Sequence, residues 1–198
     1  MIYEKTDNFF VQKINIDKIS ESRFDFFKSL CKDKKTLHIG CADAMTFNAD
    51  NNLHIFLSKT VKELMGFDIN ISDLQRLKDI CHGTYFTSID ECKKYDYDII
   101  IIPEVLEHTF NAKDFLDGIF SLNTKETLIS VPNIIHYSKE MLCSEYYFTE
   151  IVHPDHKYWF SPYTLYNVVK PYIKNERLCR MYYLENGSMI AIHIISKK

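Results

Sequence analysis

Acidic and histidine side chains follow the most apolar stretch of the chain at a spacing that suits chemistry. Residues 98–102 read as a buried strand, and Glu104, Glu107 and His108 come directly after it. In an α-helix that begins at Glu104, positions i, i+3 and i+4 lie on one face, so the three side chains would project together. Two carboxylates and an imidazole on one face can hold a divalent cation.

A second pair of histidines lies further along the chain. His153 and His156 belong to residues 133–160, which are rich in aromatic residues and histidines and have no clear period. With His108 they are the candidate general bases, because an imidazole gains and loses protons near neutral pH. The sequence leaves open whether the pair is hydrogen-bonded within a loop, contacts a substrate or binds a metal.

Strand and helix patterns alternate along the part of the chain that must position these groups. Helical periodicity predicts helices over residues 17–31, 53–64 and 111–122 and a further helix around residues 74–80. Strands are expected at residues 36–39, 65–67, 84–87, 98–102 and 127–131.

This alternation predicts an α/β fold with a doubly wound, mostly parallel sheet. The chain ends differently, because residues 178–184 and 189–196 are strand-like and flank Asn186 and Gly187, a hairpin signal. The last strand is therefore expected to be antiparallel. We expect a single domain over residues 1–198, in which residues 133–160 form a lid over the substrate, since ligands bind beyond the carboxyl ends of parallel strands.

Composition limits the class of protein. The 198 residues are 46% hydrophobic and 26% charged, which is ordinary for a globular chain. A net charge of −3 and only four arginines argue against broad contact with nucleic acid or an acidic membrane, but recognition of a nucleic-acid end stays possible.

The cysteines and the hydropathy bear on location. Six cysteines without a CxxC motif are expected to be free thiols in a reducing cytosol rather than zinc ligands. The start of the chain lacks a signal-peptide pattern, and no apolar run is long enough for a bilayer, so a cytoplasmic location is expected. The sequence gives no prediction of the oligomeric state.

Four segments in order resemble the class I S-adenosylmethionine (SAM)-dependent methyltransferases. They are the glycine loop at residues 37–44, the acid-terminated strand at 66–69, residues 97–108 and residues 128–133. The resemblance covers roughly residues 35–135, and the terminal hairpin agrees with the sheet of that family. It implies SAM as cofactor, whereas the GxGxxG motif of nicotinamide-binding enzymes is absent.

The resemblance also implies which residues contact the cofactor. Small residues in the loop would let the backbone approach the methionine part of SAM, Asp68 would accept the ribose hydroxyls, and Ser88 and Ile89 would contact adenine. The full set is His38, Gly40, Cys41, Ala42, Asp68, Ile69, Ser88, Ile89 and Pro103. The chain departs from the family pattern at His38, where an acid is usual, at Ala42 and Ala44, where glycines are usual, and at Ser88, where Asp is common.

Residues 153–160 resemble a stretch of the methyltransferases that modify the terminal ribose of small RNAs. Carried over from them, the ligands of one divalent cation (Mg, Mn, Zn or Fe) would be Glu104, Glu107, His108 and His156. Ubiquinone-pathway O-methyltransferases are similar at residues 104–108, and sequences from polysaccharide gene clusters are similar at residues 153–165. The alternative is that residues 104–108 pack under the cofactor, with Glu107 solvated and a histidine as simple base.

These features predict a SAM-dependent O-methyltransferase for a small hydroxylated acceptor, a sugar or sugar-linked metabolite of polysaccharide biosynthesis. Two other functions stay open. A ribose-end RNA methyltransferase would use the same chemistry on a different acceptor. A non-catalytic SAM-binding protein would explain the altered glycine loop.

Overall fold

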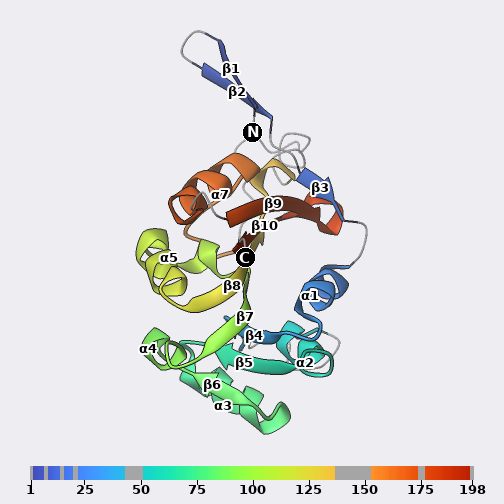
Figure 1. The fold of residues 1–198 in the computed structure, drawn as a ribbon, viewed down its shortest axis with the longest axis vertical. Coiled ribbons are helices and arrows are strands. Elements are labelled where there is room, and N and C mark those ends of the chain that lie inside the picture. Colours follow the sequence, from blue (N-terminus) through green and yellow to red (C-terminus); the bar gives the residue numbers. More distant parts are fainter. Residues whose placement is uncertain are drawn as a thin grey trace.

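The computed structural model describes residues 2–6, 9–13, 16–19, 22–42, 51–136, 153–173 and 177–196. Their centre is an eight-stranded sheet of order β3-β9-β10-β8-β7-β4-β5-β6 (Figure 1). The strands are β3 (Ile16–Lys18), β4 (Lys35–Ile39), β5 (Glu63–Phe67), β6 (Thr84–Phe86), β7 (Asp96–Pro103), β8 (Asn123–Pro132), β9 (Arg177–Leu184) and β10 (Met189–Ser196).

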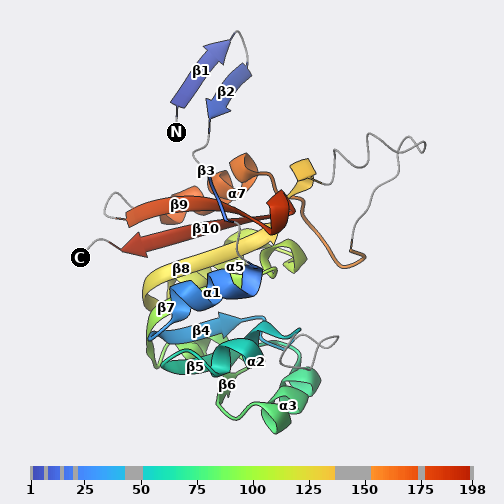
Figure 2. The same ribbon diagram turned by 90° about the vertical axis from the view of Figure 1, so that its right-hand side faces the viewer.

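Strand direction confirms the predicted fold class. The strands from β4 to β8 pair in parallel, whereas β10 runs antiparallel to both β8 and β9. Strand β3 adds to the outer edge of β9 in parallel. A separate two-stranded sheet, β1 (Ile2–Thr6) and β2 (Phe9–Lys13), projects from one end of the molecule (Figure 2).

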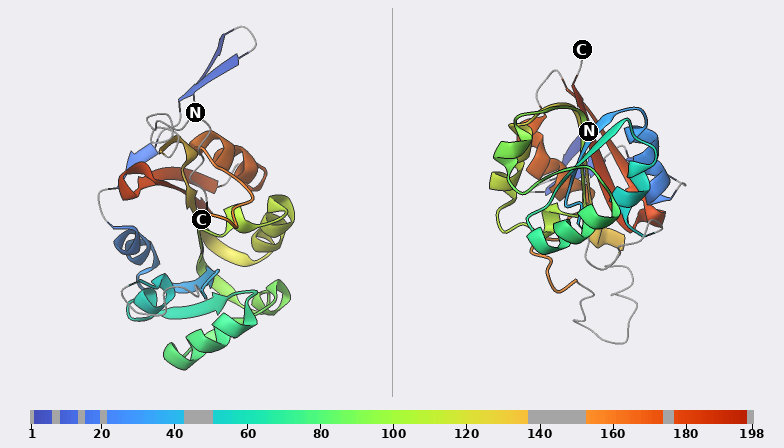
Figure 3. Two further views of the ribbon diagram at one scale, coloured as in Figure 1. Left: turned by 180° about the vertical axis from the view of Figure 1, so that it is seen from behind. Right: turned by 90° about the horizontal axis from the view of Figure 1, so that it is seen from below.

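Helices cover both faces of the sheet (Figure 3). On one face lie α1 (Arg23–Cys31) and α2 (Leu53–Ser58), with α3 (Ile71–Ile80) packed against α2. On the other lie α4 (Ile89–Cys92), α5 (Ala112–Phe120) and α7 (Pro162–Val169). The described residues also include the 3-10 turns η1 (Leu106–His108), η2 (Lys170–Tyr172) and η3 (Glu185–Gly187). No helix among the described residues is long and apolar enough to cross a membrane.

The aliphatic residues of β7 contribute side chains to the hydrophobic core on both faces of the sheet. Ile99 and Ile101 pack with α1 and α2, while Ile100 and Ile102 pack with α5, and all four are fully buried. Side chains alternate between the two faces of a strand, so a strand covered on both sides must be apolar throughout. The same pairing carries Glu104 to the edge of the sheet where the parallel strands end.

Two predicted helices are wrong at their ends. The helix expected over residues 17–31 begins only at Arg23, because residues 16–18 pair with β9 and Ser22 caps the helix by accepting a hydrogen bond from the Asp25 amide. The helix expected over residues 53–64 ends at Ser58, because Val61 forms a bridge with Lys32 and β5 begins at Glu63.

Two histidines are buried against each other between β4 and α2. The Nδ1 atoms of His38 and His54 lie 3.3 Å apart, and the side chains are 4% and 1% exposed. Burial lowers the pKa of His54 to about 3 and the pKa of His38 well below its usual value, so both imidazoles are neutral at pH 7. One ring then donates the shared proton and the other accepts it.

Replacing His54 should change how stability depends on pH. A buried neutral histidine contributes stability above the pKa of about 6.5 of the unfolded chain, and that stability is lost as the pH falls toward the folded pKa. Between pH 7.5 and 5.0 the loss is about 2 kcal/mol per buried histidine. In His54→Gln the loss over this range should be smaller by that amount in urea unfolding. His82 is exposed, so His82→Gln is the control. If the free energy of unfolding changed with pH equally in wild type and His54→Gln, the neutral histidine pair would be contradicted.

Two glycines should respond oppositely to replacement by alanine. At Gly66 in β5 an added Cβ would lie 2.6 Å from Cys41 Sγ and from Tyr85 Cδ1, so Gly66→Ala should destabilise the fold by about 1–3 kcal/mol. At Gly118 in α5 the nearest atoms are 3.8 Å away, so Gly118→Ala should stabilise it by about 0.5–1 kcal/mol. Thermal unfolding of both variants distinguishes the effects. A stabilised Gly66→Ala would show that the contacts at β5 relax.

Candidate functional site

The loop after β4 joins the carboxyl ends of three strands. Gly40 has a φ of +74°, and an added Cβ there would lie 2.4 Å from Val105 Cγ2, beyond β7. The amides of Gly40 and Cys41 both donate to the carbonyl of Phe67, at 2.8 and 3.2 Å. Glycine is therefore required here, since it alone combines this conformation with the close approach of Val105.

Asp68 lies directly after β5 beside this loop. Its Oδ2 accepts a hydrogen bond from the Ala42 amide and its Oδ1 from the Asn70 amide, each at 2.9 Å. The residue is 9% exposed, and burial raises the pKa of its carboxyl above the usual value. Each carboxylate oxygen keeps a further lone pair, so Asp68 can still accept hydrogen bonds from hydroxyl groups.

The other predicted cofactor contacts lie around the same edge of the sheet or just beneath it. Ile69 is 81% exposed next to Asp68, and Cys41 is buried with its sulfur close to Gly66. The Ser88 hydroxyl caps α4 by accepting from the Glu91 amide, and Ile89 packs against the core. His38 lies in the buried histidine pair, and Pro103 ends β7.

The predicted helix that begins at Glu104 is wrong. Strand β7 ends at Pro103, Glu104 has a φ of +50°, and the short turn η1 follows. A residue in the left-handed region interrupts an α-helix, so Glu104 does not share a helical face with Glu107 and His108.

Glu104 is instead held toward α1 and β8. Its Oε2 forms an ion pair with Arg23 at the start of α1, and its Oε1 accepts from the Ser130 hydroxyl at 3.1 Å. The Glu104 amide also donates to the Ser130 carbonyl at 2.9 Å. Sequence reasoning missed Arg23, because no motif connects it to a residue 81 positions away.

Glu107 is the least satisfied polar side chain of this region. It is 1% exposed, and neither carboxylate oxygen has a hydrogen-bond partner among the residues that the structure describes. Burial raises its pKa to about 8. Its carbonyl accepts hydrogen bonds from the amides of Lys157 and Tyr158, at 2.7 and 3.3 Å, which fixes residues 153–160 against η1.

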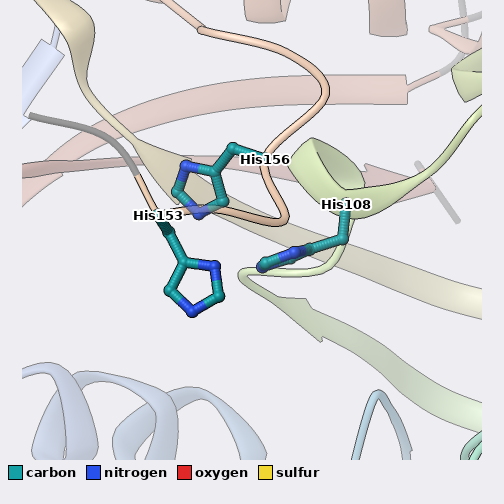
Figure 4. A group of neighbouring side chains, drawn as sticks. All are labelled: His108, His153 and His156. Atoms are coloured by element: carbon teal, nitrogen blue, oxygen red, sulfur yellow. The ribbon is translucent and has the colours of Figure 1, made fainter. Parts of the chain in front are cut away.

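Three histidines meet where these segments touch (Figure 4). One ring nitrogen from each of His108, His153 and His156 lies within 4.8 Å of the others. His108 comes from η1 and the other two from residues 153–160. Asp155 lies 3.3 Å from His108 Nδ1. The structure thus brings His108, His153 and His156 together, while their roles as bases or metal ligands stay predictions.

The three histidines of this group, together with the buried carboxyl of Glu107 next to His108 in the chain, offer donor atoms of the kind that a divalent cation takes. His156 Nδ1 is buried without a partner among the described residues, as are both Glu107 oxygens. Burial, followed by the charges of the neighbouring histidines, lowers the pKa of His156, so the ring is neutral and able to ligate. Imidazoles and carboxylates together suit Mn, Zn or Fe. The group of donor atoms that lie close together among the described residues contains the histidines but neither Glu104 nor Glu107.

The two ends of the predicted lid pair with each other directly after β8. Asn133 and Phe160 form a parallel bridge, and the Ile134 amide donates to the Phe160 carbonyl at 2.9 Å. The Trp159 ring meets the His156 ring edge-on, with 5.8 Å between the centroids. Residues 137–152, which include Tyr146 and Tyr147, lie outside the described residues, so closure over an acceptor stays a prediction.

Comparison with known proteins supports the fold. No family model matches the chain, and no curated protein does. Among solved structures, the small RNA methyltransferase HEN1 has a TM-score of 0.71 at 18% identity and matches 89% of this chain. The chain spans only 25% of that HEN1 chain.

Two further structures match over most of both chains. The methyltransferase domain of bacterial CtHen1 has a TM-score of 0.55 at 16% identity and matches 86% of this chain and 94% of its own. The magnesium protoporphyrin IX methyltransferase ChlM from Synechocystis PCC 6803, solved with bound SAH, has a TM-score of 0.58 at 13% identity and matches 88% and 81%. With its terminal antiparallel hairpin on a parallel sheet, the chain has the class I methyltransferase fold.

Proposed function

We propose that this chain is a SAM-dependent O-methyltransferase that acts on a small hydroxylated acceptor, a sugar or sugar-linked metabolite. The observation that carries the proposal is the set of side chains at the carboxyl ends of the parallel strands. There Asp68 follows β5, and Glu107 and His108 follow β7, where His108 meets His153 and His156. A cofactor-binding carboxylate and a group of bases or metal ligands are what methyl transfer to a hydroxyl requires.

The loop after β4 and Asp68 would hold the cofactor. The turn at Gly40 keeps backbone rather than side chains at the carboxyl end of β4, where the methionine part of SAM would lie. Asp68 would accept hydrogen bonds from the ribose hydroxyls while the Ala42 and Asn70 amides keep its carboxylate in place. The exposed Ile69 would cover the adenine ring.

The histidine group would receive the proton of the acceptor. In the transfer, the hydroxyl oxygen forms a bond to the sulfonium methyl as the carbon–sulfur bond breaks, and the hydroxyl proton passes to an imidazole and then to solvent. His153 is the most exposed of the three and is suited to exchange that proton with water. Asp155 would stabilise a positive charge that develops on His108.

His108, His153, His156 and Glu107 would hold a divalent cation here. Such a cation would lower the pKa of the acceptor hydroxyl and orient a vicinal diol. Without a cation, the buried carboxyl group of Glu107 would have to stay protonated or reach water. The residues of the chain therefore support metal assistance as part of the proposal.

A second acceptor, the terminal ribose of RNA, is favoured by the match to HEN1 and to CtHen1. The net charge of −3 favours the small acceptor, because RNA binding gains most of its affinity from basic residues on phosphates. An assay of SAH release with a panel of sugars and nucleotide sugars, and with a short single-stranded RNA, separates the two. Turnover with RNA alone would replace the sugar proposal, and SAH binding without turnover would favour a non-catalytic protein.

Asp68→Ala should weaken SAH binding. It removes two charge-assisted hydrogen bonds to ribose, which are together worth roughly 2–4 kcal/mol, or about 30- to 1000-fold in Kd. Calorimetry with SAH measures the loss, and the exposed Asp79→Ala in α3 is the matched control. Unchanged SAH affinity in a folded Asp68→Ala protein would place the ribose site elsewhere.

His156→Ala should remove methyl transfer while leaving SAH binding intact. The loss in kcat/KM should be at least about 100-fold, because acceptor activation and orientation fail together. Exhaustive chelation should likewise abolish methyl transfer by wild type, and added Mn²⁺ should restore the methyl transfer. Full turnover after chelation, with no metal found by elemental analysis, would end the metal part of the proposal and leave a histidine as the base.

A further inference from the structure

We propose that Arg23 and Glu104 together bind the amino acid end of SAM. The Arg23 guanidinium takes its carboxylate, and the Glu104 carboxylate takes its ammonium group. This inference rests on the proposed function, because it needs SAM in the loop after β4. It gives a role to a residue of α1 that lies outside all the motifs that resemble methyltransferases, and it gives Glu104 a role that needs no metal.

The ion pair lies beyond the carboxyl ends of the parallel strands, where the cofactor would bind. Glu104 directly follows β7, and Arg23 begins α1 at the same end of the sheet, since the two side chains are in contact. The next residue, Val105, has its Cγ2 atom 2.4 Å from the position that a Cβ on Gly40 would take. The turn that would carry the methionine part of SAM therefore lies against the segment that carries Glu104.

The length of the cofactor matches the distance across these strands. Strand β4 lies between β5 and β7, so at about 4.8 Å per strand the ends of β5 and β7 are about 10 Å apart. With single bonds of about 1.5 Å, extended SAM separates its ribose hydroxyls from its amino acid end by a distance on the order of 10 Å. Ribose held by Asp68 after β5 therefore brings the amino acid end to Glu104 after β7.

The two side chains match the charges of a free amino acid. At neutral pH SAM carries a carboxylate and an ammonium group on one carbon. A guanidinium binds a carboxylate through two parallel hydrogen bonds, and a carboxylate accepts hydrogen bonds from an ammonium group. The Arg23 and Glu104 side chains are 22% and 23% exposed, so both can be reached from solvent. Binding exchanges one ion pair for two, so neither charge loses its partner, and the Ser130 hydroxyl continues to hold the Glu104 carboxylate at 3.1 Å.

A cavity beside Arg23 has room for the carboxylate of the ligand. Its volume is about 610 Å³, and Arg23 is the one basic residue among the described residues that line it. Asp25 and Glu185 also line it, and each already accepts a hydrogen bond at 2.7 Å, Asp25 from the Ser22 hydroxyl and Glu185 from the Arg23 amide. An anionic group that enters this cavity therefore binds at the Arg23 guanidinium.

Calorimetry with two ligands tests the proposal. SAH keeps the amino acid end of SAM, whereas methylthioadenosine lacks it and keeps the adenine, the ribose and the sulfur. Arg23→Gln should weaken SAH binding about 10- to 100-fold, the scale of one hydrogen-bonded charge pair, and should leave the Kd of methylthioadenosine unchanged. Glu104→Gln should have the same pair of effects, because it removes the partner of the ammonium group.

Lys34→Gln is the matched control. Lys34 pairs with Glu126 in a similarly half-buried ion pair that involves no residue of the candidate site, so its loss should leave both affinities unchanged. Arg23→Lys keeps the charge but offers no planar pair of donors, so its SAH affinity should fall between those of wild type and Arg23→Gln. Thermal unfolding shows that each variant keeps its fold.

Each outcome decides between clear alternatives. If Arg23→Gln lost affinity for both ligands equally, or for neither, the proposal would be overturned and the ion pair would be a structural contact between α1 and β7, while the methyltransferase proposal would stand. If wild type bound neither ligand, the proposed function would fail and this inference with it. If Arg23→Gln and Glu104→Gln do not fold, the Arg23 Nε–H signal of wild type decides. It should shift when SAH is added and stay unchanged with methylthioadenosine, and any other result would overturn the proposal.

Discussion

The candidate site depends on the paired hydrogen bonds that the Gly40 and Cys41 amides donate to the Phe67 carbonyl. They close the end of β4 onto β5, so that Asp68 meets the Ala42 amide, and they leave Gly40 in contact with Val105 beyond β7. The carboxyl ends of three adjacent parallel strands thereby share one edge. A larger residue at position 40 would separate β4 from β7, and with it the candidate cofactor residues from the histidines.

Much of the fold could be predicted from local pattern. The buried run of β7 and the hairpin signal at Asn186 and Gly187 each identify their strands, because burial on both faces and a tight turn constrain residue type strongly. The start of α1 and the end of α2 could not be predicted. They are set by β3 pairing with β9 and by the Val61–Lys32 bridge, and pairing between distant segments leaves little mark on helical periodicity.

The candidate site likewise contains features that could be predicted from the sequence and features that could not. Asp68 and His108 lie beyond the carboxyl ends of β5 and β7, because the order of the parallel strands determines which end of the sheet they reach, while their roles stay predictions. The orientation of Glu104 could not be predicted, because it follows from a single left-handed residue and from an arginine on another element. His153 and His156 lie on a segment whose Lys157 and Tyr158 amides bind the Glu107 carbonyl, and such a contact between distant segments leaves no local pattern in the sequence.

Asp68 and Glu107 show how two buried carboxylates in one region differ in what they need. Burial raises both pKa values, but two backbone amides offset part of the effect at Asp68. The Glu107 oxygens receive no hydrogen bond from any described residue, and the pKa rises to about 8. A carboxylate left without donors is costly in a dry interior, and a proton or a cation must balance it. At pH 7 a proton would satisfy Glu107 in the resting protein, whereas a dication held by the adjacent imidazoles would bind its charged form, so loading should release a proton. Glu107 would thus connect the stability of the fold to the chemistry of the proposed metal site.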